Sequence, residues 1–424
     1  MKSFPQFKDN ERDSQLCKVL TEGIWNKYHD KKDSLGVTFK QCILSGCQNT
    51  DSGIGVYAAS PNSYEAFSDL FSPIIEDYHK VKINAGHTSN MDHTQLKCPP
   101  LPEEDQKMIK STRIRVARNL AQFPLGPGIS KEQRNEVTKL VTSALSTFEG
   151  DLKGTYYSLD SMTPQQQQSL IDDHFLFKEG DRFLEACGLN RDWPEGRGIF
   201  HNDAKTFLTW VNEEDQLRII SMQQGADIGE VFSRLARAVA EISKKVDFAH
   251  SKNLGYITSC PTNLGTAMRA SVHIHLPYLG KSKKEFQAIA DKYHVQIRGA
   301  HGEHTETDDH IYDLSNKRRL GRSEVDLVQD MYDGVTAMIA KEKELRPAEV
   351  SKPEPKAEPV AAPVEEVKPE PVAETKSEPI KCGPHLKKPE DLTGFPTFPE
   401  GTKSLVSKFV TEAVWEELKD KVDD

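Results

Sequence analysis

The stretch TFLTWVNEEDQLRIISM (206–222) contains two short apolar runs joined by five polar residues. The runs TFLTWV (206–211) and LRIISM (217–222) are rich in the β-branched and aromatic residues that favour strands. The polar NEEDQ (212–216) between them predicts an antiparallel hairpin. The next segment, DIGEVFSRLARAVAEISKKV (227–246), repeats apolar residues every three or four positions and therefore predicts a helix with one buried face.

The pattern on either side of this hairpin indicates an α+β protein. The first 90 residues favour helices, and FSDLFSPIIEDYHKV (67–81) is amphipathic at helical spacing. NLGYITSC (253–260) and ASVHIHLPYL (270–279) are typical of further strands, and 323–345 of a final helix. We therefore expect a small all-α N-terminal domain and a larger domain with an antiparallel β-sheet flanked by helices.

Four regions are expected along the chain: a helical domain at 1–90, a larger domain at 91–346, a linker at 347–389 and a terminal fragment at 390–424. The linker holds ten of the 24 prolines and no aromatic residue, so it cannot bury enough apolar area to fold. FPTFPEGTKSLVSKFVTEAVWEELKDK (395–421) echoes residues 4–32, with TE, an aliphatic residue and Trp at matching places. It is therefore interpreted as a repeat of the start of the first domain.

The overall composition excludes several classes of function. The formal net charge is -10, which disfavours nucleic-acid binding. No apolar run is long enough for a membrane span, and the polar start is unlike a secretory signal. The seven cysteines are scattered without CxxC spacing. These features favour a cytoplasmic protein and argue against a disulfide framework or a structural zinc site.

The arginines are the more informative charged residues, because several of them together could bind a polyphosphate, although any one is more commonly a surface charge. The sequence contains neither GxxxxGK[ST] nor a GxGxxG that opens a helix. If the chain binds a nucleotide, it therefore uses neither a P-loop nor a Rossmann phosphate-binding motif. HGEHTE (301–306) is not HExxH, and no metal ligands are assigned. A guanidinium fork matches phosphate oxygens, although spacing alone does not show that arginines converge. The candidates are Arg113 and Arg115 of STRIR, Arg218, Arg269 and Arg298.

Two further motifs carry candidate chemistry. In CPTNLGTAMRASVH (260–273), Cys260 could be a nucleophile, a metal ligand or a core thiol. In the acidic turn, Glu213, Glu214 and Asp215 could be simply solvated or could serve the reaction. Glu303 follows Arg298 in a segment that Gly299 and Gly302 would make mobile.

Several long motifs in order resemble the phosphagen kinases, ATP:guanidino phosphotransferases. They cover about residues 10–346, and SGIGVYA (52–58) with EGDLKGTYYSL (149–159) resembles the arginine-specific members. The other matching motifs are CPTNLGTAMRASVH, STRIR, VNEEDQLRIIS, IDDHFLFKEGDRFL, RGIFHND and SNKRRLG. The resemblance implies a reversible transfer of phosphate between ATP and a guanidino substrate, L-arginine first, with Mg²⁺ and ATP/ADP.

The resemblance also implies roles for residues. Arg113, Arg115, Arg218, Arg269, Arg298 and His174 would bind the nucleotide. Glu214 and Glu303 would hold the guanidinium, with Glu214 accepting its proton. Cys260 would place the guanidinium as a thiolate favoured by nearby cations, without a covalent step. The loop holding the amino-acid end would contain Ser52, Gly53, Ile54 and Tyr57, and Asp51 would pair with Arg182 between domains.

The chain also departs from the family pattern and leaves alternatives open. Ala267 and Met268 replace the usual pair before Arg269, commonly Gly-Leu or Thr-Val, and His301 stands where an arginine is common. Alternatives are a kinase for taurocyamine or creatine, a protein-arginine kinase, or a non-catalytic binding member. The carboxylate of Glu303 argues against creatine as the substrate, because creatine kinases usually carry an apolar residue there. The N-terminal helical domain argues against a protein-arginine kinase, because the bacterial relatives lack it. A monomer or weak homo-oligomer is expected.

The terminal fragment gives a first prediction. One amphipathic helix cannot build a core, and isolated short helices are marginal in water, so the fragment should take no part in the chemistry. Turnover and arginine affinity of a chain ending at Arg346 should equal those of the full chain. Side-by-side kinetics at equal active concentration measure this. A drop of about tenfold in turnover, equal to ~1.4 kcal/mol, would contradict a passive tail.

Overall fold

The computed structural model describes residues 3–7, 13–172, 175–177, 179–299 and 309–346. The linker and terminal fragment predicted at 347–424 therefore lie outside the described residues. The first helices are α1 (Gln15–Val19), α2 (Glu22–Tyr28), α3 (Phe39–Gln48), α4 (Ser63–Ala66) and α5 (Ser68–His79). The later helices are α6 (Glu103–Gln106), α7 (Lys131–Leu145), α8 (Pro164–Asp172), α9 (Arg182–Ala186), α10 (Ile228–Ser243), α11 (Lys283–Lys292) and α12 (Glu324–Glu344).

The strands form one large sheet and one short ribbon. They are β1 (Ile109–Arg118), β2 (Gly154–Ser158), β3 (Gly198–Asn202), β4 (Phe207–Val211), β5 (Leu217–Gln224), β6 (His250–Ser251), β7 (Gly255–Tyr256), β8 (Met268–His275), β9 (Val295–Gly299) and β10 (Ile311–Asn316). Within the described residues, the large sheet has eight strands in the order β2-β3-β4-β5-β1-β8-β10-β9, and every neighbouring pair is antiparallel.

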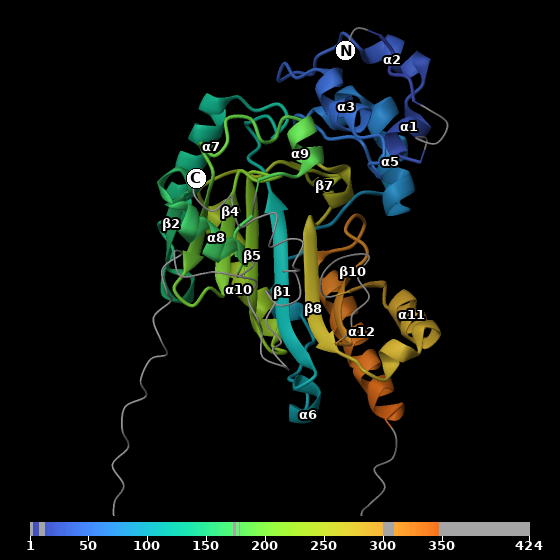
Figure 1. Ribbon diagram of the computed structural model, residues 1–424, viewed down its shortest axis with the longest axis vertical. Coiled ribbons are helices and arrows are strands. Elements are labelled where there is room, and N and C mark those ends of the chain that lie inside the picture. The colour runs from blue at the N-terminus through green and yellow to red at the C-terminus, as the bar shows by residue number, and fades with distance from the viewer. Residues whose placement is uncertain (1–2, 8–12, 173–174, 178, 300–308, 347–424) are drawn as a thin grey trace, which may run out of the picture. The chain divides into compact units, whose positions relative to one another are not determined.

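The predicted α+β class is confirmed. Figure 1 shows the N-terminal helices α1, α2, α3 and α5 gathered beyond one end of the sheet. Their formation follows from local signals: Thr38 caps α3 in a capping box with Gln41, and Thr21 caps α2. Among the described residues, no helix is both long and apolar enough to cross a bilayer.

One face of the sheet is the core of the larger domain. α10 packs on β5 and β1, and α12 on β10 and β8. Phe232, Leu235, Val239 and Ile242 of α10 are buried, as their spacing predicts. Ile219 on β5 is fully buried in the same core. The opposite face carries the candidate arginines and, over β3, β4 and β5, a further apolar cluster that includes Leu208, Trp210 and Ile220.

The hairpin prediction is confirmed, and one strand prediction is wrong. β4 pairs with β5, with Trp210 opposite Arg218. Residues 253–260, predicted to be a strand, contain only the two-residue β7, which pairs with β6 in the short ribbon and not with the large sheet. Tertiary hydrogen bonds explain this difference, because the backbone of 258–260 contacts the N-terminal helical region: the Ala58 N–H donates to the Ser259 carbonyl at 2.7 Å.

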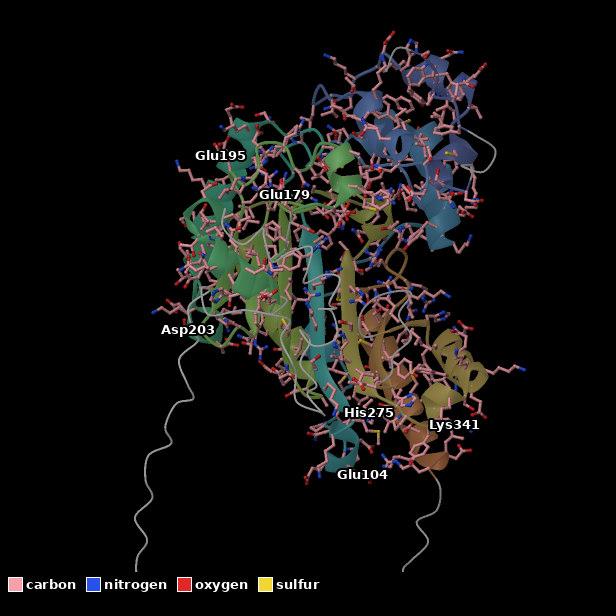
Figure 2. The ribbon with its side chains drawn as sticks, in the orientation of Figure 1. Glu104, Glu179, Glu195, Asp203, His275 and Lys341 are labelled. Atoms are coloured by element: carbon pink, nitrogen blue, oxygen red, sulfur yellow. The ribbon has the colours of Figure 1, made fainter. Side chains whose placement is uncertain are left out.

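A second apolar core joins the N-terminal helices to the larger domain. Residues of the helices, including Phe39 and Phe71, form one cluster with Ile257 and Leu264 from the loops around β7 and with Leu320 beyond β10. The helical region therefore rests on the segment that carries Cys260. Side chains at the far end of the sheet, such as Glu104, His275 and Lys341, lie away from this junction (Figure 2).

The packing of α10 generates a stability prediction. Phe232 is fully buried, so Phe232→Ala should lower the free energy of unfolding by about 3–5 kcal/mol through lost burial and a residual cavity. Urea denaturation followed by circular dichroism measures the loss. Lys245→Ala, at an exposed position just beyond α10, is the control and should stay within about 0.5 kcal/mol. Similar stability of the two variants would contradict the assigned core.

Candidate active site

The sheet register brings three of the candidate arginines together. Arg115 on β1 lies directly opposite Arg269 on β8. Arg218 on β5 lies opposite Ala117, two residues along β1 from Arg115. Side chains that are opposite each other, or two apart along a strand, share a face. Arg113 therefore belongs to the same face, which is the face that α10 and α12 leave uncovered.

The fifth arginine reaches this face through β10. Asp313 lies opposite His273 on β8 and opposite Arg298 on β9. His273 is four residues beyond Arg269 along β8, so Asp313 and Arg298 share the face of Arg269. The register thus shows a convergence that sequence spacing could not, with all five guanidinium groups on one face of the sheet.

Crowding of like charges perturbs these arginines. Burial, reinforced by the charges of Arg218 and Arg269, lowers the pKa of Arg113 to about 10. Burial and the same neighbours also lower the pKa of Arg115. The Arg113 and Arg218 guanidinium carbons lie 5.8 and 5.5 Å from the ring centre of Trp210, so the ring face offsets part of the repulsion. Such a site is electrostatically ready for a polyanion.

The acidic turn lies at one edge of the arginine face. The turn connects β4 to β5, and this places Glu213 and Glu214 beside Arg218. Glu213 Oε2 lies 2.9 Å from Arg218 Nη1, and Glu214 Oε2 lies 2.8 Å from Nη2. Both carboxylates are largely buried, with 16% of each side chain exposed. Burial opposes the Arg218 charge, but these carboxylates and Asp215 outweigh it and raise the pKa of Arg218.

Burial has the opposite consequence for Glu214. Removal from water raises the pKa of Glu214 to about 7, against the lowering effect of Arg218 and with the support of the Asp215 and Glu213 charges. A carboxyl with a pKa near neutrality is suited to accept and release a proton. The simple solvation of this turn, considered as an alternative on sequence grounds, does not describe Glu214.

Cys260 lies close to this carboxyl group. Asp215 connects the two segments, because its Oδ1 accepts hydrogen bonds from Asn119 Nδ2 at 2.7 Å and from the Ser259 N–H at 2.8 Å. Cys260 Sγ lies 3.1 Å from the Thr262 hydroxyl. Burial, reinforced by the charge of Glu214, raises the pKa of Cys260 to about 12.

Burial of Cys260 and the charge of Glu214 favour the neutral thiol over the expected thiolate in the site without substrate. The sequence interpretation relied on nearby cations, but the strongest influences on Cys260 are burial and an acidic neighbour, and both favour the neutral thiol. A cationic guanidinium bound between Glu214 and Cys260 would reverse the second influence.

The predicted substrate loop lies on the N-terminal side of this site. The Ser52 hydroxyl accepts a hydrogen bond from the Gly55 N–H at 3.1 Å. The carbonyls of Gly53 and Ile54 accept from the first residues of α1, each at 3.0 Å. Burial raises the pKa of Tyr57, and the charges of Cys260 and Glu214 contribute. The Tyr57 hydroxyl is thus near enough to both groups to interact with them.

Backbone and side-chain contacts fix this loop against the cysteine segment. The Tyr64 hydroxyl donates to the Thr258 carbonyl at 2.8 Å, in addition to the Ala58–Ser259 hydrogen bond. The proposed interdomain pair is also present, because Arg182 Nη1 donates to Asp51 Oδ1 at 2.9 Å and the two groups form an ion pair. These contacts bring the loop, the cysteine and the acidic turn into one site.

Some predicted site residues fall elsewhere. His174, Glu303 and His301 lie outside the described residues. Ala267 has a φ of 49°, in the left-handed region where glycine is favoured and an alanine side chain costs about 1–2 kcal/mol. This conformation explains why glycine at that position would be the less strained choice. Met268 is fully buried in the sheet core.

Sequence reasoning missed several residues of the site. Asp313 binds Arg269, Trp210 stacks near two arginines, and Arg319 Nη1 donates to the Thr262 carbonyl at 2.7 Å. The motif SNKRRLG contains Arg319, but the motif alone does not indicate which segment the Arg319 side chain contacts. Asp313 lies two residues before that motif. Only the register between β8 and β10 reveals that Asp313 lies on the arginine face.

Comparisons with known proteins agree with this geometry. Residues 10–76 match the N-terminal domain of the ATP:guanido phosphotransferases, and residues 136–345 match their C-terminal catalytic domain. An arginine kinase of Penaeus vannamei, Lit v 2, is 50% identical over 332 residues, which are 78% of this chain and 93% of that protein. The chain belongs to the ATP:guanido phosphotransferase family.

Two longer relatives extend the comparison. An arginine kinase of Anthopleura japonica is 55% identical over 335 residues, or 78% of this chain. The duplicated taurocyamine kinase of Schistosoma mansoni, solved with transition-state analogue components, matches with a TM-score of 0.75 and 42% identity over 82% of this chain. The chain spans about half the length of each of these two proteins, 47% and 48% respectively.

The thiol state of Cys260 generates a prediction. Because only the thiolate reacts, inactivation by iodoacetamide should be slow near neutral pH and should accelerate about tenfold per pH unit below the pKa. Peptide mass spectrometry identifies the modified residue. Cys260→Ser should resist inactivation and keep part of the turnover, because no covalent step is required. A fast, pH-independent reaction at Cys260 would show a thiolate already present.

Proposed function

We propose that this chain is an arginine kinase, which transfers the γ-phosphoryl group of ATP to L-arginine and catalyses the reverse reaction. The observation that carries the proposal is the placement of Glu214, a buried carboxyl with a raised pKa, between five arginines and the Cys260 segment. The arginines suit a nucleotide polyphosphate, and the carboxyl suits a guanidinium. The 50–55% identity to arginine kinases supports arginine as the acceptor.

The division of work follows from charge. Arg113, Arg115, Arg218, Arg269 and Arg298 would hold phosphate oxygens and offset the charge that spreads over the phosphoryl group during transfer. Fixed cations in a partly buried site stabilise that charge more than water does, because they need no reorganisation. The guanidinium would lie across the edge of this face, next to the acidic turn.

Glu214 would receive the proton. A guanidinium attacks only after it loses a proton, and its free pKa is above about 12. A carboxylate at hydrogen-bond distance orients the nitrogen and accepts the proton as the new N–P bond forms. Cys260 would contact the guanidinium on its other side, and Ser52, Gly53, Ile54 and Tyr57 would bind the amino-acid end. His174 and Glu303 remain proposals from the resemblance.

Magnesium would arrive with the nucleotide. Among the described residues, no group of three or more His, Cys, Asp or Glu side chains could hold a metal ion. The acidic side chains nearest the arginines, Glu213, Glu214 and Asp313, are engaged in ion pairs. Mg²⁺ usually keeps several water ligands and binds substrate phosphates. These side chains therefore suit an ion that is bound through the nucleotide phosphates, and its charge would help to neutralise those phosphates.

Taurocyamine is a second candidate acceptor. The likeness to a taurocyamine kinase at 42% identity favours it, and Glu214 would hold any guanidinium group. The two substrates differ at the other end, where arginine has an α-amino acid and taurocyamine a sulfonate. A coupled assay with arginine, taurocyamine and creatine therefore distinguishes them. The highest kcat/KM should be that for arginine, and a higher value for taurocyamine would replace this proposal.

Glu214→Gln tests the proton acceptor, because it keeps the shape of the side chain and removes its charge. The variant should lose about 2–4 kcal/mol of transition-state stabilisation, a fall of about 30- to 900-fold in turnover, with little change in ATP affinity. In the parent, kcat/KM for arginine should fall as pH drops through about 7, where Glu214 becomes protonated. That limb should disappear in the variant.

Glu213→Gln is the matched control. It removes the other carboxylate partner of Arg218 but leaves Glu214 in place. The acid limb should therefore persist and move to lower pH, because the negative charge that helps to raise the pKa of Glu214 is gone. Turnover of Glu214→Gln close to that of the parent, or an acid limb that both variants retain unchanged, would assign the proton transfer to another group.

A further inference from the structure

Asp313 on β10 is the acidic group at the opposite edge of the arginine face from Glu213 and Glu214. Its Oδ2 lies 2.6 Å from Arg269 Nη2, and each side chain is only 13% exposed. His273 Nε2 lies 4.0 Å from the same oxygen. Asp313 Oδ1 is buried and has no hydrogen-bond partner within the described part of the chain. A buried carboxylate in such surroundings is costly without compensating cations.

The strand register gives Asp313 a second arginine neighbour. Arg298 on β9 lies directly opposite Asp313, at a distance where opposite charges on facing strands attract each other. The charge of Asp313 also acts on Arg113, where it opposes the lowering of the pKa by burial and by neighbouring arginines. One carboxylate thus acts on arginines from two strands, β8 and β1, and lies opposite a third arginine on β9.

The arginine face is therefore held between two sets of carboxylates. Glu213 and Glu214 orient Arg218 at the hairpin edge, and Asp313 orients Arg269 at the β10 edge. Long arginine side chains lose rotamer freedom when they are fixed. A partner that fixes Arg269 before the nucleotide arrives transfers that cost from binding to folding.

We propose that Asp313 is a positioning residue that fixes Arg269 in the orientation that receives the nucleotide phosphates. Asp313 need not touch the substrate. Its carboxylate leaves the remaining N–H groups of Arg269 available for phosphate oxygens, because a guanidinium has five donors in a planar fork. The role is distinct from that of Glu214, which lies at the guanidino end of the site.

This inference rests on the proposed function only in that the arginine face binds a polyphosphate. It does not depend on which guanidino compound is the acceptor. Nucleotide binding can therefore be measured by titration calorimetry with ADP or ATP and no acceptor. Failure of the parent to phosphorylate arginine would reject the proposed function, whereas the ADP and ATP affinities of the variants would still test Asp313.

The test compares the full chain with Asp313→Asn, which keeps the size of the side chain and removes its charge. We expect kcat/KM for ATP to fall about tenfold or more, the scale of a misplaced binding group. The affinity for ATP and ADP should fall, and that for AMP should change less, because Arg269 would hold the outer phosphates. KM for arginine should stay within about twofold. A general structural defect would change both substrates alike.

Two further variants complete the test. Asp333→Asn removes one negative charge from an exposed position on α12, and both nucleotide and arginine kinetics should match the parent. Asp313→Glu keeps the charge but moves it by one methylene, so its kcat/KM for ATP should lie between parent and Asp313→Asn. This variant also decides the matter if Asp313→Asn does not fold, because unchanged ATP kinetics in a folded Asp313→Glu would overturn the proposal.

Tighter nucleotide binding by Asp313→Asn would indicate a different role for Asp313. A neutral side chain at 313 would strengthen the attraction between the arginine face and phosphate if Asp313 were only a competing anion. Equal or tighter ADP binding by Asp313→Asn, with kcat/KM for ATP retained, would therefore overturn the positioning role. Equal losses in ATP and arginine kinetics would overturn it as well, because they would indicate a defect of the whole site.

Discussion

Mutual repulsion among five arginines on one sheet face is the constraint on which the rest of this site depends. Guanidinium groups stay charged under all ordinary conditions, so the fold must compensate for them. It does so with Trp210, whose ring faces Arg113 and Arg218, and with carboxylates at both edges of the face. Burial, together with the charges of Arg218 and Arg269, still lowers the pKa of Arg113. The remaining positive field is what a nucleotide polyphosphate would neutralise.

The same compensation prepares the acidic turn for its proposed chemistry. Glu214 is buried because it pairs with Arg218, and that burial raises its pKa to about 7. A fully solvated carboxylate would be a much weaker base. The raised pKa of Cys260 has the same origin in burial and in the charge of Glu214. The proposed phosphate binding and proton transfer would thus be linked through Arg218, which contacts both Glu213 and Glu214 and belongs to the arginine face.

The N-terminal helices contribute by position. Their core continues into Ile257, Leu264 and Leu320, and the Ala58–Ser259 and Tyr64–Thr258 hydrogen bonds fix the substrate loop beside Cys260. This explains why residues 253–260 do not extend the sheet although their composition favours a strand. Their backbone groups bond to another domain, and such a partner is invisible in local sequence.

The sequence by itself determined the α+β class, the hairpin, the amphipathic α10 and the identity of most candidate site residues, because these follow from periodicity, turn composition and long motifs. It could place Arg113 and Arg115 on one face, since both lie on one strand. Only the tertiary structure decided that Arg218, Arg269 and Arg298 join them, because register between distant strands is set by packing and not by spacing. It also decided the protonation of Cys260 and the place of Asp313. Burial and charge neighbours control both, and they arise only when segments distant in the chain meet.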